Sequence, residues 1–393
     1  MTDTAASTRH DVLVVGAGLV GLALAPALAR AGLDVALVDR APLAGDATPD
    51  AASFDARVYA ISPGSAAFLA GLGAWPPVRL EAVEAMRIEG DAGGALAFSA
   101  YDLRQRALAW IVEERALRSA LLPRLAAGGV RILAPAAIGT LAFAPDVARA
   151  TLDDGRVVAA RLVVGADGLR SRVREAAGLR AVPRPYGQTA VVANFACERP
   201  HRGIARQWFL GADGVLAWLP LPGAHVSIVW SAPEALAGDL LALPAADLAE
   251  RVAAAGGRAL GALDLLAPPS AFPLAFLRLP AMVAHRLALV GDAAHGVHPL
   301  AGQGVNLGFG DAEALAAILA QRGPLADPGA PLLLERYARR RAEPVLAMQT
   351  VTDALARLFG APPRWLGWLR NAGLSAVDRL PPVKRALAQP ALR

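Results

Sequence analysis

The chain has 393 residues, with 39 Lys and Arg against 34 Asp and Glu, six His and one Cys. Hydrophobic residues make up 55% of it and charged residues 19%, which excludes a disordered chain and predicts a substantial folded core. Cys197 has no second cysteine for a disulfide, and the sequence holds no CxxC motif or Cys/His cluster. We therefore expect no metal site and a reducing, cytoplasmic location.

The positive charge is concentrated at the C-terminal end. Residues 331–393 hold eleven basic and four acidic residues, a net charge of +7, and the rest of the chain carries a net charge of −2. No basic face with interleaved aromatic residues accompanies this excess, so we expect no nucleic-acid partner.

The N-terminal region contains no segment that we expect to target or span a membrane. Residues 1–11 lack the apolar run of a secretory signal. The eighteen uncharged residues 12–29 have the length at which a membrane span begins, but three glycines and Pro26 interrupt them. A buried strand, a turn and a buried helix fit this pattern better.

The first predicted unit along the chain is a strand, a turn, a helix and a second strand. Residues 11–15 form an apolar strand, the helix continues to Arg30, and the second strand covers residues 34–39. A unit of about 30 residues has the size of a βαβ motif.

The rest of the chain falls into three predicted regions. A polar loop at 41–56 precedes helices at 65–73 and 113–126 and a buried strand at 157–164. Alternating, aromatic segments then predict antiparallel strands at 189–195, 206–210, 215–219 and 225–230, with a helix at 245–255. A strand at 286–290, a helix at 305–320 and a helical region with proline breaks from Pro331 complete the pattern.

These elements predict an α/β fold with a Rossmann-like dinucleotide-binding domain, an inserted β-rich substrate domain and a helical C-terminal segment. We expect the first domain to comprise residues 1–75, 102–182 and 281–330. The second is expected to comprise residues 76–101 and 183–280, and the helical segment residues 331–393.

A glycine pattern follows the first strand at the position where a dinucleotide-binding motif requires it. Gly16 permits a tight turn, Gly18 lets the backbone approach a pyrophosphate, and Gly21 lets the helix pack closely on the strand. The N-terminus of the helix presents N–H groups and a positive dipole end to the phosphates. Asp39, at the end of the second strand, is placed to accept a hydrogen bond from a ribose hydroxyl group. It disfavours a 2′-phosphate, so the site suits FAD or NAD; glycines that only serve a turn in another α/β fold are the alternative.

Two further motifs lie far downstream of the glycine turn. Gly165-Ala-Asp167-Gly168 follows a strand, and a denser motif runs from Gly291-Asp292 to Gly308. In this order, the three motifs resemble those of the flavoprotein aromatic hydroxylases, the family of p-hydroxybenzoate hydroxylase. A finer resemblance, to the ubiquinone-biosynthesis hydroxylases (the UbiH/UbiF/VisC group), rests on residues 55–62, 110–115, 298–306 and 382–388.

The resemblance implies tightly but non-covalently bound FAD. Asp292, next to Gly291, is implied to bind the ribityl hydroxyl groups, with a helix N-cap as the alternative role. Backbone N–H groups at the start of the following helix are implied to face the pyrimidine end of the flavin. The residues concerned are Gly302, Gly304, Val305 and Asn306.

The resemblance also places Asp167 and Gly168 in a loop near FAD and the nicotinamide of NAD(P)H. The chain has no second glycine fingerprint, so NAD(P)H is expected to visit as a transient reductant. Arg57 and Arg115 are expected to contact FAD, because Arg suits bidentate phosphate binding, and ordinary surface arginines are the alternative.

Other residues leave their roles open. His295 and His298 are three residues apart without a third ligand motif, so packing near the flavin is favoured over a metal site. Three tryptophans of the β-rich region could line a pocket for an aromatic ring or fill a core, namely Trp208, Trp218 and Trp230. The sequence identifies no catalytic base.

The implied activity is that of an FAD-dependent aromatic-ring monooxygenase. It uses NAD(P)H and O2 to hydroxylate a prenylated phenol in ubiquinone biosynthesis, through a hydroperoxide at the flavin C4a carbon. A hydroxylase of a soluble phenolic or secondary-metabolite substrate, and a non-catalytic flavin-binding scaffold, remain alternatives. A flavin halogenase is disfavoured, because the W-x-W-x-I-P signature is absent.

The C-terminal segment also carries an apolar stripe. Its residues recur at helical spacing and precede Trp365 and Trp368: Val345, Met348, Val351, Leu355 and Leu358. Together with the basic residues, the stripe predicts peripheral contact with the inner face of the membrane or with a ubiquinone-biosynthesis complex. Packing of the stripe against the protein's own core is the alternative.

Overall fold

The first sheet is built on the N-terminal strand. The computed structural model describes residues 8–43, 54–298, 304–359 and 364–392. In it, β1 (Thr8–Val15) pairs in parallel with β2 (Val35–Val38) and β11 (Val157–Gly165). The strand order is β18-β19-β11-β1-β2-β8, and β9 and β10 extend the sheet from β11. The bounds of the remaining strands are β8 (Arg131–Leu133), β9 (Ile138–Phe143), β10 (Ala148–Leu152), β18 (Val283–Ala284) and β19 (Leu287–Leu289).

Helices cover this sheet, which explains why its strands are almost entirely apolar. The core beside β1 includes residues of α1 (Leu19–Arg30), α3 (Glu114–Ala127) and α7 (Gly304–Ala320). Helix α1 lies close to α7, because Gly308 carries no side chain: a Cβ there would lie 2.5 Å from Cγ2 of Val20. The predicted strand–turn–helix–strand unit and the predicted α/β fold are confirmed.

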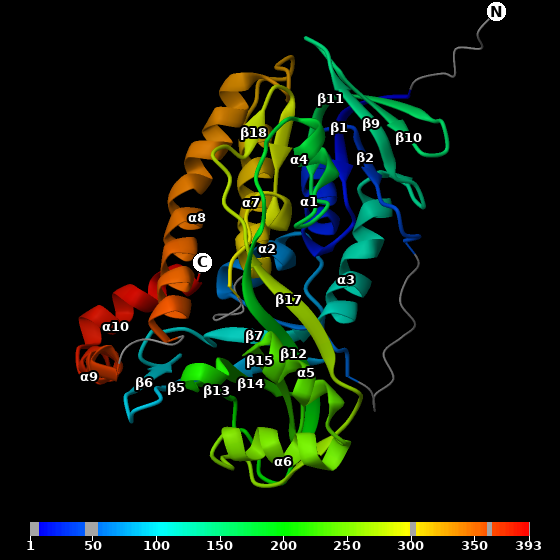
Figure 1. Ribbon diagram of the computed structural model, residues 1–393. Helices are drawn as coiled ribbons and strands as arrows, with labels where there is room; N and C mark the ends of the chain where they lie inside the picture. Colours follow the sequence, from blue (N-terminus) through cyan, green and yellow to red (C-terminus); the bar gives the residue numbers. More distant parts are fainter. Residues whose placement is uncertain (1–7, 44–53, 299–303, 360–363, 393) are drawn as a thin grey trace, which may run out of the picture.

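The second sheet lies at the other end of the molecule (Figure 1). Its strand order is β16-β12-β15-β14-β13-β5-β6, with β17 paired to β12. Helices α5 (Glu234–Ala242) and α6 (Ala245–Ala255) pack on one face. The strands are β5 (Ala85–Glu89), β6 (Ala95–Ser99), β12 (Arg184–Cys197), β13 (Ile204–Phe209), β14 (Val215–Leu221), β15 (His225–Pro233), β16 (Leu263–Leu265) and β17 (Ser270–Phe276).

The core between this sheet and its helices contains all three tryptophans of the β-rich region. Trp218 and Trp230 are only 1% exposed and pack with α6, and Trp208 stacks edge-on to Trp218 at 4.9 Å. Core packing, one of the two roles that the sequence left open for them, is the one observed.

A small third sheet lies at the junction of the two larger ones. It consists of β3 (Val58–Ile61), β7 (Ala109–Glu113) and β4 (Leu80–Val83), in the order β3-β7-β4. Helix α2 (Pro63–Gly71) follows β3, and the Oγ atom of Ser62 caps it by accepting the N–H of Ser65. The predicted division of the chain into domains stays a prediction, and this arrangement of sheets supports it.

The C-terminal segment is helical, as expected, but Pro344 does not break it. Helix α8 (Pro331–Phe359) continues through Pro344, and α9 (Arg364–Asp378) and α10 (Pro381–Ala388) follow. In Figure 1, α8 runs beside the first sheet, and α9 and α10 lie near β5 and β6. None of the helices in the described part of the chain combines the length and apolar character that a membrane span needs.

The apolar stripe of α8 is divided between the protein's own core and its surface. Leu355 and Leu358 pack against Phe209 and Val215 of the second sheet. Val351, in contrast, is 51% exposed. The alternative of packing against the protein's own core is therefore found for the end of the stripe, but not for Val351.

Candidate functional site

The glycine turn after β1 is braced by Asp39. The N–H group of Ala17 donates to Oδ2 of Asp39 at 2.6 Å, and the N–H group of Ala41 donates to Oδ1 at 2.8 Å. Gly16 has a φ of +106°, a conformation that favours glycine. At Gly18, the N-cap of α1, a Cβ would meet nothing within 4 Å and no side chain caps the helix. The turn thus leaves the N-terminus of α1 open to a phosphate group.

A cleft of about 470 Å³ contains three arginines. The Nη1 atom of Arg118, on α3, donates to the carbonyl oxygen of Ala17 at 3.1 Å, so the cleft adjoins the glycine turn. The sequence reasoning missed Arg118, although it lies one helical turn after the predicted Arg115. The cleft is lined by Asp55, Ala56, Arg57, Glu114, Arg115, Arg118 and Phe272.

Glu113 at the end of β7 positions two of the arginines in this region. Its side chain is 1% exposed and its Oε2 accepts both the N–H of Asp55, at 2.9 Å, and Nε of Arg115, at 2.8 Å. Its Oε1 accepts Nε of Arg79 at 2.6 Å. A buried carboxylate thus holds Arg115 at the edge of the cleft. An ordinary surface arginine has no such partner.

Asp292 lies in the short turn η2 (Gly291–Ala293), directly after the buried strand β19. Its side chain is exposed, no hydrogen bond to its carboxylate is found among the described residues, and it caps no helix. Even so, burial raises the pKa of this carboxyl group, although the charges of His295 and Arg57 lower it. The carboxylate is thus exposed and has no hydrogen-bond partner among the described residues. We therefore conclude that it is available to a ligand.

Arg57 belongs to the same region as Asp292, as its electrostatic effect on that carboxyl group shows. Its guanidinium lies over the ring of Phe272, 4.3 Å from the centroid, and 3.6 Å from Oε2 of Glu114. The predicted Arg57 and Arg115 therefore line one cleft, and Arg57 connects it to Asp292.

Asp311, which the sequence reasoning missed, holds the turn that carries Asp292. It is fully buried on α7, and its Oδ2 accepts the N–H of Gly291 at 2.9 Å and lies 2.6 Å from Nε2 of His295. Its Oδ1 accepts Nε of Arg341, on α8, at 2.6 Å. Burial by itself would raise the pKa of Asp311, but the hydrogen bonds and charges of His295 and Arg341 outweigh it and hold the pKa below its ordinary value. His295 thus contacts a buried carboxylate, and no metal-ligand group includes it in the described part of the chain.

Asp167 and Gly168 form the turn after β11. Oδ2 of Asp167 accepts the N–H groups of Arg172, at 2.7 Å, and Val173, at 3.2 Å, at the start of α4 (Arg172–Ala176). Gly168 has a φ of +80°. Buried Arg174 donates to the carbonyl oxygens of Leu169 and Ala293, so the Asp167 turn and the Asp292 turn are tied together.

Helix α7 begins at Gly304, close to the predicted start, and Val305 packs partly buried against the core. The side chain of Asn306 joins this helix to β3 and α2. Its Oδ1 accepts the N–H of Ser62 at 2.9 Å, and its Nδ2 donates to the carbonyl oxygen of Ala60 at 2.7 Å. The predicted Gly302 lies outside the described residues.

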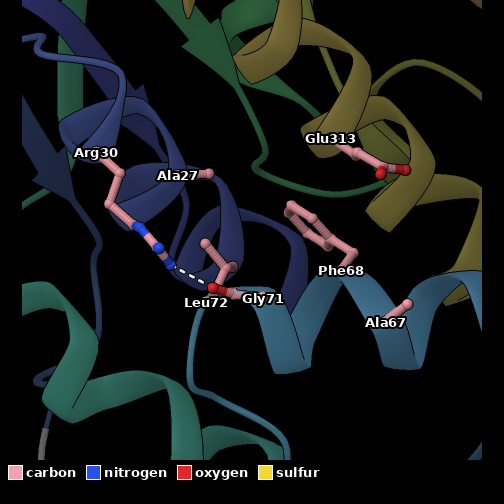
Figure 2. A pocket seen from close by; sticks show the side chains of 7 residues that line it. All are labelled: Ala27, Arg30, Ala67, Phe68, Gly71, Leu72 and Glu313. Carbon is pink, nitrogen blue, oxygen red and sulfur yellow. Dashed lines mark hydrogen bonds between the residues drawn. The ribbon is translucent and has the colours of Figure 1, made fainter.

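A second pocket, of about 370 Å³, lies between α1, α2 and α7, away from the glycine turn. Figure 2 shows Arg30 donating from the C-terminal end of α1 to the carbonyl oxygen of Gly71, with Phe68 and Glu313 at the other side. It contains none of the predicted site residues, and we assign it no role. No group of three potential metal ligands occurs in the part of the chain that the structure describes.

The model of the family named FAD binding domain matches residues 9–353. The chain is a member of this family. It is 42% identical over 390 residues to the ubiquinone hydroxylase UbiL of Rhodospirillum rubrum, covering 97% of this chain and 89% of that protein. It is 35% identical to the 3-demethoxyubiquinol 3-hydroxylase of Escherichia coli, covering 97% and 98% of the two chains.

Solved structures agree with this family. PqsL of Pseudomonas aeruginosa, described as an FAD-dependent monooxygenase, superposes with a TM-score of 0.78 at 26% identity, covering 93% of this chain and 99% of that one. The p-nitrophenol 4-monooxygenase PnpA of Pseudomonas putida, at 19% identity and a TM-score of 0.77, has the same fold. The expected FAD-dependent monooxygenase is confirmed.

The residues of this FAD-binding family member fit the cofactor. The open helix N-terminus at Gly18 and the arginine cleft suit a pyrophosphate. The Asp292 carboxylate, which has no partner among the described residues, suits the hydroxyl groups of a ribityl chain. FAD supplies the redox chemistry, and the chain supplies its position.

Replacing Asp311 by Ala tests the network behind the Asp292 turn. The change leaves Arg341 buried without its carboxylate, so we expect the free energy of unfolding to fall by about 3–5 kcal/mol in urea titrations at pH 7. The pKa of Asp311 is lowered in the folded state. Its stabilisation is therefore full above the ordinary carboxyl pKa, about 4, and is lost as the pH falls through the lower, folded-state value.

The matched control is Glu335→Ala, which removes an exposed ion pair with Arg339 on α8. We expect this control to cost about 0.5 kcal/mol or less. Equal losses for the two variants would contradict the role given to Asp311.

Proposed function

We propose that the protein hydroxylates the aromatic ring of a prenylated phenol in ubiquinone biosynthesis, with NAD(P)H as electron donor and O2 as oxygen donor. The observation that carries this proposal is the 42% identity to the ubiquinone hydroxylase UbiL along 97% of the chain. A second relative, from Escherichia coli, also bears the name of a ubiquinol hydroxylase and matches along 97% of the chain. Both alignments include the second sheet, where we place the substrate.

The predicted site residues are assigned to FAD as part of this proposal. Gly16, Gly18 and Gly21 shape the turn for the pyrophosphate. Asp39 holds that turn, and its carboxylate also accepts a hydrogen bond from a ribose hydroxyl group. Arg57 and Arg115 bind the phosphates, now joined by Arg118, and Asp292 binds the ribityl chain. The start of α7 at Gly304, Val305 and Asn306 is assigned to the flavin ring, with Asp167 and Gly168 in the adjoining turn.

The face of the second sheet opposite the tryptophans suits an apolar ring. Trp218 and Trp230 point toward α6, so their neighbours along each strand point to the other face. Val192, Val229 and Ala217 are register partners across three strands on that other face. Such a surface excludes water from the reacting ring, which suits an oxygen-transfer reaction.

A prenylated substrate resides in a membrane, so we extend the proposal to peripheral contact with an anionic bilayer. The C-terminal helices carry exposed apolar side chains beside basic residues, where each basic residue near the surface adds about 1 kcal/mol. The exposed apolar residues of this segment include Leu346, Val351, Leu380 and Val383. Association with a complex of ubiquinone-biosynthesis enzymes would use the same surface.

Asp292→Ala tests the flavin assignment. Loss of a hydrogen bond to a charged group costs about 1.5–3 kcal/mol, so we expect FAD to bind about 10- to 100-fold more weakly. The measurement is the flavin absorbance per protein after purification, together with titration of the apoprotein. Asp239→Ala, an exposed carboxylate on α5, is the control and should keep its flavin. Full flavin content in a folded Asp292→Ala variant would refute the assignment.

Isotope labelling tests the reaction. The purified flavoprotein, supplied with NADH or NADPH, a prenylated phenol and labelled O2, is expected to place one labelled oxygen atom in each product molecule. Label that arrives from water would exclude oxygen transfer from O2. Equal turnover of phenols with and without a prenyl chain would instead favour the soluble-substrate alternative.

The membrane proposal is tested by Leu380→Ser combined with Val383→Ser. Each substitution removes up to about 1.5–3 kcal/mol of the free energy gained when the apolar side chain is buried in the bilayer. We therefore expect at least a tenfold drop in sedimentation with anionic vesicles. Leu325→Ser, which changes a 93% exposed leucine in a loop, is the control and should sediment like the unaltered protein. Undiminished vesicle binding by the double variant would count against this surface.

A further inference from the structure

His298 is the one histidine near the Asp292 turn whose contacts the fold does not complete within the described residues. It is 2% exposed, and its Nε2 lies 2.8 Å from Oε1 of Gln188. Because an amide oxygen only accepts hydrogen bonds, Nε2 must carry the proton, and Nδ1 is left with a bare lone pair. That Nδ1 atom is buried and has no hydrogen-bond partner among the residues that the structure describes. A buried acceptor without a donor is costly, so the site calls for a donor from a ligand.

The imidazole lies where the two large sheets meet. It follows Asp292 by six residues on the loop after β19, whereas Gln188 belongs to β12 of the second sheet. The pairing of β12 with β17 shifts register between Pro185 and Thr189, which is where Gln188 meets the histidine. Gly296, two residues before His298, pairs with Leu277 just after β17. His298 therefore lies between the Asp292 turn and the second sheet, where we place the substrate.

An aromatic side chain packs against the histidine, and a second packs against the first. The ring of Tyr186 stands edge-on to it, with centroids 4.8 Å apart, and the ring of Phe276 lies 6.4 Å from that of Tyr186. Arg184, paired with Asp353 of α8, is the charged neighbour on β12. Burial lowers the pKa of His298 to about 4, against the smaller opposing effect of Asp353, so the imidazole is neutral at physiological pH. A neutral acceptor among aromatic rings suits a phenol.

We propose that His298 is a catalytic residue of the hydroxylation: its Nδ1 accepts the hydrogen bond of the substrate's phenolic hydroxyl group, and Gln188 is the positioning residue that fixes its tautomer. This proposal rests on the proposed function, since it requires a phenolic substrate.

Proton transfer from the phenolic hydroxyl group to Nδ1 would speed the hydroxylation. An electrophilic oxygen attacks a phenol ring faster as the O–H bond gives up its proton, because the electron pair of that bond then flows into the ring. The proton moves to Nδ1, and the freed electron pair is shared by the phenolic oxygen and the ring, so that a ring carbon forms the new C–O bond as an O–O bond breaks. That carbon then loses its hydrogen as a proton. O2 is the oxidant, and NAD(P)H supplies the two electrons with which its second oxygen atom leaves as water. The hydroxyl group becomes far more acidic as the ring is attacked, so a weakly basic imidazole suffices to take the proton at that moment.

His298→Gln tests this role, because the glutamine amide nitrogen can still donate to Gln188 while the Nδ1 acceptor is gone. We expect unchanged folding and FAD content and at least a 100-fold lower kcat for product formation, with NAD(P)H oxidation uncoupled from hydroxylation. The loss should shrink along a series of increasingly acidic phenols. The ultraviolet band of the bound phenol should also shift toward that of the free molecule. His285→Gln, an exposed histidine, is the control and should match the unaltered enzyme.

Gln188 provides a second pair of variants. Gln188→Met removes the acceptor that fixes the tautomer and should lower kcat about tenfold, whereas Gln188→Asn keeps an uncharged amide oxygen as acceptor and should retain more of the rate. A His298→Gln enzyme with full coupled activity would overturn the proposal. So would an equal loss for all phenols or a loss of flavin, since either indicates a structural role. An unaltered enzyme that hydroxylates no prenylated phenol refutes the proposed function itself, and this proposal with it.

Discussion

The buried carboxylate of Asp311 is the constraint on which the cofactor site depends. An isolated charge in the core is strongly unfavourable, so its three partners must stay in place for the protein to fold. Those partners come from the turn beside Asp292, from the loop that continues to His298, and from α8. A change at Asp311 is therefore expected to affect both the stability of the core and the position of the Asp292 turn.

The loop that follows β19 also connects the first sheet to the second. Its first part carries Asp292, which we assign to FAD, and its later residue His298 contacts Gln188 of the second sheet. Arg174 adds a further tie between the Asp167 and Asp292 turns. Because these contacts are buried, they hold the Asp167 turn, the Asp292 turn and the second sheet in place relative to one another.

Much of the fold could be predicted from local patterns. The glycine turn, Asp39 and the buried strand before Asp292 have signatures within a few residues, because one short segment builds each of them. Asp311, Arg118 and Gln188 could not be found in this way, since their roles depend on contacts between distant segments. The prediction that a proline breaks the C-terminal helix was wrong at Pro344. The first turns of α8 pack on the core, where the hydroxyl group of Tyr337 donates to the carbonyl oxygen of Leu289. A helix that is held by such packing tolerates an internal proline.

The most direct test of this account is an experimental structure of the protein with FAD bound. We expect the pyrophosphate at the N-terminus of α1 beside Gly18, and a ribityl oxygen within hydrogen-bond distance of the Asp292 carboxylate. The flavin ring should lie between the start of α7 and the second sheet. A flavin bound elsewhere, or an Asp292 carboxylate turned away from the ribityl chain, would contradict the account.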